Sequence, residues 1–316
     1  MDINLLFWKN EGKTFLSRLR IWFSVLDPRS LFSSDVSTQE NGLFTTPSCC
    51  VLLYNRYDYL NIIFLQSSVH AGTSDILPTV FRPQGTVALI KLDVVASFLP
   101  HTMVKSALLW QFLLQSYVAG FNHANRNTLP DQGLKTSLKQ GLLIVGSVAY
   151  ATCAGAIPQI VMRRLRLSSP AAQMFFRSIL PIPLSASLMY FNVVVIRSEE
   201  SENGIQVFDT DGNSVGMSKA AGTKAVQETA VSRAALFGTT AAVPSLVLFL
   251  LQKGRFLQSP LLLAPIRHIS TAIVLGLMIP VSFSLYPQLG TIKKENLEKE
   301  FQPAAASGPL FYHKGL

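Results

Sequence analysis

The polar side chains best suited to binding a small molecule are Gln115, Ser116, Asn122, Asn125 and Arg126, which close a long apolar stretch. They lie within about three helical turns of one another. Amides both donate and accept hydrogen bonds, so this group could hold the ammonium and the carboxylate of a zwitterionic metabolite. The same residues could instead cap the helix and anchor it among lipid headgroups, and the sequence leaves both interpretations open.

Two further candidates, Asn192 and Arg197, end another apolar stretch that contains Pro181 and Pro183. A proline inside a helix removes a backbone donor and frees a carbonyl one turn earlier. Broken helices of this kind line substrate sites in transporters, although a kink satisfied by neighbouring helices is the simpler alternative. We expect Asn192 to face the first polar group, and Arg197 to hold a carboxylate or to reach the headgroups.

Other chemistry has little support in the sequence. There is no GxSxG, P-loop or HExxH pattern, the five histidines are far apart, and the three cysteines form no CxxC pair. The acidic run 209–213 is similar to the start of an EF-hand loop, but Ala220 stands where that loop needs a glutamate. We therefore predict no catalytic residue, no metal site and no cofactor, and we do not expect an enzyme.

The elements that must position the candidates are five apolar stretches, near residues 103–121, 138–161, 174–196, 230–251 and 262–287. About 20 apolar residues in a helix cross the hydrocarbon core of a bilayer, and in lipid such a segment must be helical. The chain is 49% hydrophobic and only 14% charged, with a mean hydropathy of +0.33. These features predict an all-α polytopic membrane protein with about five transmembrane helices, some of them broken by proline.

Small residues recur at a spacing of four within three of these stretches. Such stripes allow close approach of helix backbones, so we interpret them as packing surfaces rather than ligand sites. The members are Ser147, Ala151 and Gly155, then Ala234, Gly238 and Ala242, and finally Ala272 and Gly276.

The transmembrane domain, residues 94–287, is flanked by a water-exposed or interfacial region, 1–93, and by a C-terminal tail, 288–316. In the first region, six apolar residues fall on one helical face: Phe15, Leu16, Leu19, Trp22, Phe23 and Leu26. This helix either lies in the membrane interface or packs on the protein's own soluble part. In the loop 197–228, Asp211 and Gly212 between two apolar runs predict a β-hairpin.

The basic residues of the chain, which carries a net charge of +9, are scattered around the ends of the apolar stretches. Anionic headgroups of the lipid bilayer are the natural partners of such a distribution. A nucleic-acid partner is not expected, because there is no contiguous basic face and no aromatic platform for stacking bases.

Several ordered motifs resemble those of the sideroflexins, multipass proteins of the mitochondrial inner membrane. They are Asp27-Pro28-Arg29, the polar group 115–126, Asn192 with Arg197, the loop 204–216, Val231-Ser232-Arg233 and the C-terminal run 311–316. The family's HPDTG motif keeps only His70 and Thr73, and Leu114 and Val118 replace two amides. These departures place the chain in a divergent branch of the family.

The resemblance implies a mitochondrial inner-membrane protein that transports a small amino acid, with serine as the family's best-known cargo. The lost amides disfavour serine itself, because they remove polar partners that a small zwitterion needs. The divergent branch also implies an alternative, a non-transporting assembly factor for respiratory complex I that is linked to iron–sulfur and iron homeostasis. Complex I assembly factors are the partners expected under that alternative.

Overall fold

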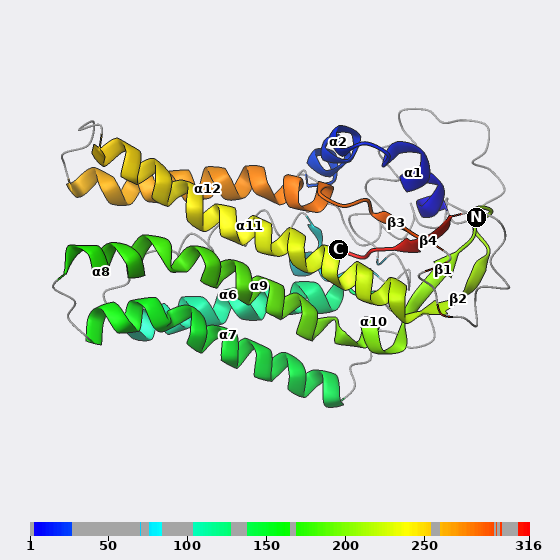
Figure 1. Ribbon diagram of the computed structural model, residues 1–316, viewed down its shortest axis with the longest axis horizontal. Coiled ribbons are helices and arrows are strands. Elements are labelled where there is room, and N and C mark those ends of the chain that lie inside the picture. The colour runs from blue at the N-terminus through cyan, green and yellow to red at the C-terminus, as the bar shows by residue number, and fades with distance from the viewer. Residues whose placement is uncertain are drawn as a thin grey trace.

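The protein is a bundle of long helices with a small β-sheet and two short helices at one end (Figure 1). The computed structural model describes residues 3–26, 70, 76–83, 104–127, 138–164, 169–253, 260–293, 295, 298 and 309–316. The motif 27–29 and Thr73 lie outside these residues.

The long helices are α6 (Val104–Ala124), α7 (Leu138–Arg164), α9 (Pro181–Ile196), α11 (Lys219–Lys253) and α12 (Pro260–Ser284). Among the described residues, four segments are long and apolar enough to cross a membrane: 138–164, 171–196, 219–253 and 262–284. The predicted helical membrane architecture is confirmed. Helix α6 covers the first predicted span with 21 residues but is not among these four, so the predicted number of about five is approximate.

The prolines interrupt the helices less than the sequence suggests. Helices α7, α11 and α12 continue through Pro158, Pro244, Pro265 and Pro280. The third segment instead changes geometry: α8 (Pro170–Met174) leads into a π-helical turn, η3 (Phe175–Ile179), and α9 begins at Pro181. A π-helical turn widens the helix locally, and such turns are frequent at functional sites.

Small residues lie where the helices approach most closely. Ala151 on α7 is fully buried, and a Cβ atom added at Gly238 on α11 would lie 3.3 Å from the Cβ of Ala186 on α9. At Gly155 on α7 an added Cβ would lie 2.6 Å from Oε1 of Gln111 on α6. At Ala151 and Gly238 the predicted packing role is confirmed, because a larger side chain would press on the neighbouring helix. At Gly155 the nearest neighbour is the flexible end of the Gln111 side chain, so the packing role is not confirmed there.

The predicted hairpin is confirmed and belongs to a larger sheet. After the short helix α10 (Ser198–Asn203), β1 (Ile205–Phe208) pairs antiparallel with β2 (Ser214–Ser218). The side chain of Asp209 accepts hydrogen bonds from the backbone N–H groups of Asp211 and Asn213, which closes the turn. The tail supplies two strands that the sequence did not predict, β3 (Leu289–Ile292) and β4 (Leu310–His313), in the order β2-β1-β4-β3.

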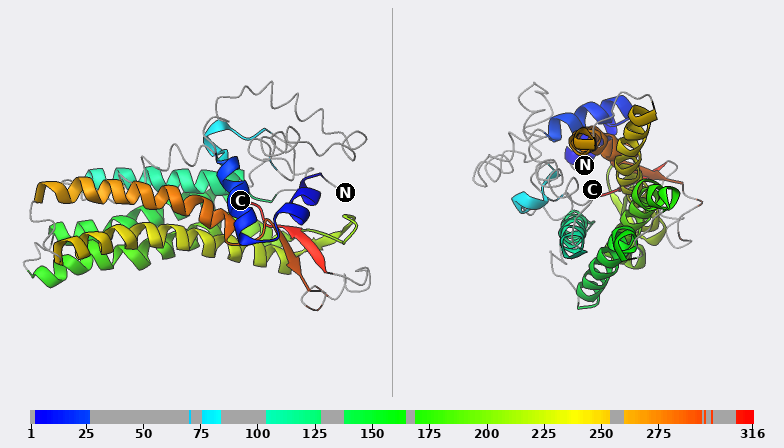
Figure 2. Two further views of the ribbon diagram at one scale, coloured as in Figure 1. Left: turned by 90° about the horizontal axis from the view of Figure 1, so that it is seen from above. Right: turned by 90° about the vertical axis from the view of Figure 1, so that its left-hand side faces the viewer.

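The N-terminal helices α1 (Ile3–Glu11) and α2 (Phe15–Val25) lie at the sheet end of the bundle, where α2 crosses its long axis (Figure 2). One face of α2 packs on the protein: the ring of Trp22 stacks on Phe283 at 4.7 Å, and Arg18 donates to the carbonyl of Ser284. Leu16 and Phe23, on another face, are exposed to solvent among the described residues. The helix thus packs on the end of α12 and keeps an apolar face uncovered, so both predicted alternatives stay open.

Candidate functional site: a polar cavity in the helical bundle

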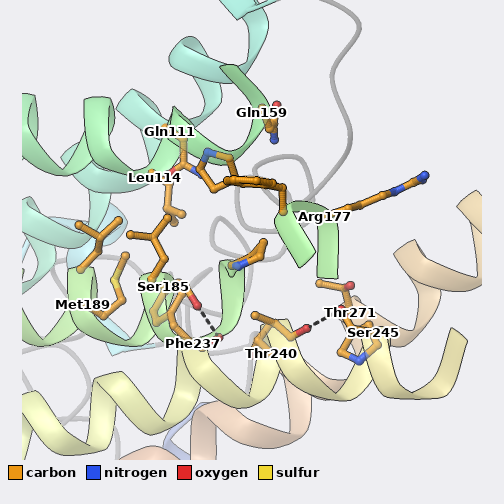
Figure 3. Close-up of a pocket in the computed structure, with 18 of the residues that line it drawn as sticks. Gln111, Leu114, Gln159, Arg177, Ser185, Met189, Phe237, Thr240, Ser245 and Thr271 are labelled. Carbon is orange, nitrogen blue, oxygen red and sulfur yellow. Dashed lines mark hydrogen bonds between the residues drawn. The ribbon is translucent and has the colours of Figure 1, made fainter. Parts of the chain in front are cut away.

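A cavity of about 90 Å³ lies inside the bundle, between the π-helical turn and helices α6, α7, α9, α11 and α12 (Figure 3). Apolar side chains, among them Leu114, Met189 and Phe237, form part of its wall. The polar side chains that line it are Gln111, Gln115, Gln159, Arg177, Ser185, Thr240, Ser245, Arg267 and Thr271. A mixed wall of this kind suits a small polar molecule, because few but well-placed polar groups fix its orientation.

Gln115 is the most informative residue of the wall. Its side chain is 1% exposed, and its Oε1 atom has no hydrogen-bond partner among the described residues. Leaving a buried amide oxygen unpaired costs about 1–3 kcal/mol, so a native structure normally avoids it. An orphan acceptor at the edge of a cavity is therefore a natural contact for a bound donor.

Prolines of three elements meet at the cavity: Pro158 on α7, Pro181 at the start of α9 and Pro244 on α11. A proline within a helix leaves the carbonyl one turn earlier without its usual donor. Hydroxyl groups lie nearby: Ser185 donates to the carbonyl of Ile182 at 3.1 Å and is 3.4 Å from that of Phe237. The site thus combines polar side chains with irregular helical backbone.

The structure brings Asn122 and Asn192 together outside the lining of the cavity. Nδ2 of Asn122 donates to Oδ1 of Asn192 at 3.3 Å, and both side chains are buried. Asn122 lies on the same face of α6 as Gln115, two turns further on, and Asn192 lies one turn beyond Met189. The other half of each amide, Oδ1 of Asn122 and Nδ2 of Asn192, has no partner among the described residues.

Of the seven candidates, only Gln115 lines the cavity. Ser116 is half-buried and lies outside the lining. Asn125 donates to the carbonyls of Phe121 and Phe81, the latter in the 3₁₀ turn η2 (Thr79–Phe81), so it caps α6 and fixes this turn. Nη2 of Arg126 lies 3.9 Å from Oε2 of Glu199. The backbone carbonyl oxygen of Arg126 lies 2.6 Å from Nε2 of His70.

Arg197 does not line the cavity, and the carboxylate that it holds belongs to the protein itself. Its side chain is fully buried and forms an ion pair with Glu200, with Nη2 2.7 Å from Oε2. It also donates to Thr229 at 3.1 Å and to the backbone carbonyls of Lys314 and Leu316. Arg197 therefore joins α9, α10 and α11 to the C-terminal tail.

The tail brings further cationic groups into this end of the bundle. Burial, together with the positive charge of Arg233, lowers the pKa of Lys314 to about 7. Burial likewise lowers the pKa of His313 to about 4. Arg233 lies over the ring of Phe283 at 4.2 Å and donates to Ser282. Desolvation thus disfavours positive charge at the tail.

Sequence reasoning missed several cavity residues. Gln111 lies one helical turn before Gln115, so helical spacing could have indicated it. Arg267 lies inside the last apolar stretch, and an ionisable residue within a membrane segment is itself a signal for a functional site. Gln159 lies next to Pro158 inside the second apolar stretch, and an amide within an apolar helix is a similar signal. Within the described residues, no group of three or more His, Cys, Asp or Glu side chains is placed to hold a metal ion.

Apolar helices packed through small residues around a polar cavity define a multipass helical membrane protein. The sequence profile of the Sideroflexins matches residues 2–316, so the chain belongs to the sideroflexin family. Sideroflexin-4 of Danio rerio is 50% identical to it over 321 residues, with both chains covered in full. Human sideroflexin-4 is 34% identical, with 100% of this chain and 93% of the relative covered. Human sideroflexin-5 is 32% identical, with 97% and 91% covered. No solved structure matches the chain.

Proposed function

We propose that the protein is a transporter of the mitochondrial inner membrane that moves a small amino acid or a related zwitterionic metabolite through the bundle. The observation that carries this proposal is Gln115, a fully buried amide at the cavity wall whose acceptor has no partner among the described residues. Membership in the sideroflexin family supports a role of this type.

The geometry suggests how the two ends of the path differ. The lining of the cavity includes Gln115, Gln159 and Arg177, whereas the Asn122–Asn192 hydrogen bond lies outside the lining, further along α6 and α9. Beyond that contact, Arg197 and Glu200 hold the tail. Transport would require this side to open, and the half-satisfied amides offer a bound metabolite groups to pair with as it advances.

Serine is disfavoured as the cargo. Leu114 lines the cavity and Val118 is buried in the hydrophobic core, so neither position offers the amide that the sideroflexin motif has there. A substrate with more apolar surface than serine would have a smaller desolvation cost on contact with Leu114 and Met189. Discrimination by such a wall is modest, at about 1–3 kcal/mol per methylene.

Uptake into liposomes tests the proposal. Purified protein would be reconstituted and assayed with a panel of labelled amino acids, each compared with empty liposomes. We expect uptake of at least one compound, and at least a tenfold loss in Gln115→Leu, which removes the buried amide. Gln227→Leu is the matched control, because Gln227 lies exposed on α11. No flux above empty liposomes for any compound would refute transport.

A second function, that of a non-transporting assembly factor for respiratory complex I linked to iron–sulfur and iron homeostasis, is favoured by one observation. Leu16 and Phe23 leave an apolar face of α2 uncovered among the described residues, beside the sheet and away from the cavity. An assembly factor needs such a contact surface. If this is the function, Leu16→Glu with Phe23→Glu abolishes co-purification with assembly intermediates, whereas Gln115→Leu does not. If the double glutamate variant still co-purifies with assembly intermediates and Gln115→Leu does not, this second function is excluded.

A further inference from the structure

A second hollow, the distal groove, is lined by residues of α8, the π-helical turn, α9, α11 and α12. The ends of these elements that line it lie away from the sheet (Figure 1). The groove has a volume of about 560 Å³. Arg177 and Arg267 lie in both the distal groove and the central cavity, and His268 belongs to the groove alone. Its apolar wall includes Met174, Ile179, Ile182, Leu246, Phe249 and Leu263.

The two arginines have no anionic partner within the protein's helices. Residues 94–130, 132–198 and 229–294 contain no Asp or Glu at all. Neither guanidinium has a hydrogen bond or an ion pair with another described residue, and the two lie close enough to repel one another. Cations in a membrane protein are normally paired, so an anion from outside the chain is the missing partner.

The wall of the distal groove indicates what carries that anion. Met174, Leu246 and Phe249 are exposed large apolar side chains, and they lie on segments that are long and apolar enough to cross a membrane. A ligand with an anionic head and an apolar chain would satisfy the arginines and cover this surface together. A small soluble anion would leave the apolar wall uncovered.

We infer that the distal groove binds an anionic phospholipid, with its phosphate between Arg177 and Arg267 and an acyl chain along Leu246 and Phe249. Guanidinium groups recognise phosphate through two parallel hydrogen bonds, and basic pockets between membrane helices suit such headgroups. Arg177 extends away from the other labelled cavity residues (Figure 3). Gln115, which carries the transport proposal, does not line the distal groove. The lipid site therefore does not depend on the proposed transport.

Thermal stability in detergent tests this lipid site. Phosphatidylglycerol should raise the melting temperature of the wild-type protein by several degrees, and phosphatidylcholine should raise it much less, because a ligand that binds only the folded state stabilises it. Arg177→Gln with Arg267→Gln should lose this difference. Lys253→Gln, which removes an exposed cation at the same end of the bundle, should keep it. Equal stabilisation by both lipids, or a double variant that responds like the wild type, would overturn the inference.

Two further measurements on the wild-type protein keep the test independent of how the variant folds. A photoreactive phosphatidylglycerol should label the groove segments around residues 174–182, 242–252 and 263–268. Labelling confined to other segments would overturn the inference. Glycerol phosphate, which has the head without the chains, should stabilise little. If it protects as well as the lipid, the site binds a soluble anion, and the assignment to a phospholipid is wrong.

Discussion

Replacing Arg197 by methionine should destabilise the protein strongly. The change keeps much of the side-chain volume but leaves Glu200, whose side chain is 1% exposed, as a buried charge without its cation. It also removes donors from Thr229 and from the carbonyls of Lys314 and Leu316. Removing one partner of a buried ion pair costs about 3–5 kcal/mol.

The assay is thermal unfolding of the purified protein in detergent. At roughly 2 °C per kcal/mol for a chain of this length, Arg197→Met should lower the melting temperature by about 6–10 °C. Lys139→Met is the matched control: Lys139 pairs with Glu202 at 2.7 Å, but the two side chains are 65% and 52% exposed. Exposed pairs contribute about 0–1 kcal/mol, so this control should shift by about 2 °C at most.

A double variant separates the stranded charge from the lost contacts. Glu200→Gln added to Arg197→Met removes the charge yet keeps an oxygen that can accept from Asn127, which donates to Glu200 in the native structure. We expect the double variant to be more stable than Arg197→Met alone. The reasoning is refuted if Arg197→Met melts within about 2 °C of the wild type, the limit set for the control, or if Glu200→Gln brings no recovery in that background.

Single residues carry three further predictions. Gly222→Ala should lower the free energy of unfolding by about 1–3 kcal/mol, because the added Cβ would overlap the backbone of Glu200. Gly141→Ala is the control: it has open space around it and should be neutral or slightly stabilising. Equal effects of the two substitutions would contradict the prediction. Gly155→Ala should reduce uptake into liposomes with little change in stability, because the added Cβ displaces the flexible side chain of Gln111 at the cavity wall. Unchanged uptake would count against Gln111 as part of the transport path. Burial and Arg233 lower the pKa of Lys314 to about 7, so the folded state releases this proton before the unfolded state does. The free energy of unfolding should therefore rise between about pH 7 and pH 9, by at most about 1.4 kcal/mol per pH unit. Lys314→Met should flatten this rise when melting temperatures are measured across the same pH range. An identical slope in the variant would refute the prediction.

How much of the site could be read from the sequence depends on the range of the interactions. Gln115 was predictable because an amide inside an apolar helix is expensive unless it has a function or a partner. Gln111 and Arg267 carried the same kind of signal, as polar residues in apolar helices. By contrast, no local pattern indicates that Arg197 meets Lys314, which lies 117 positions away.

The sequence by itself determined the membrane helices, the hairpin and the sideroflexin family, because apolar length, turn chemistry and ordered motifs are local properties. Tertiary structure alone decided which polar residues share a cavity and which hold the fold. It placed Gln115 at the cavity, paired Asn122 with Asn192, and gave Arg197 to the C-terminal tail. The physical reason is that the role of a polar group inside a bundle depends on the partner opposite it, and that partner comes from another helix.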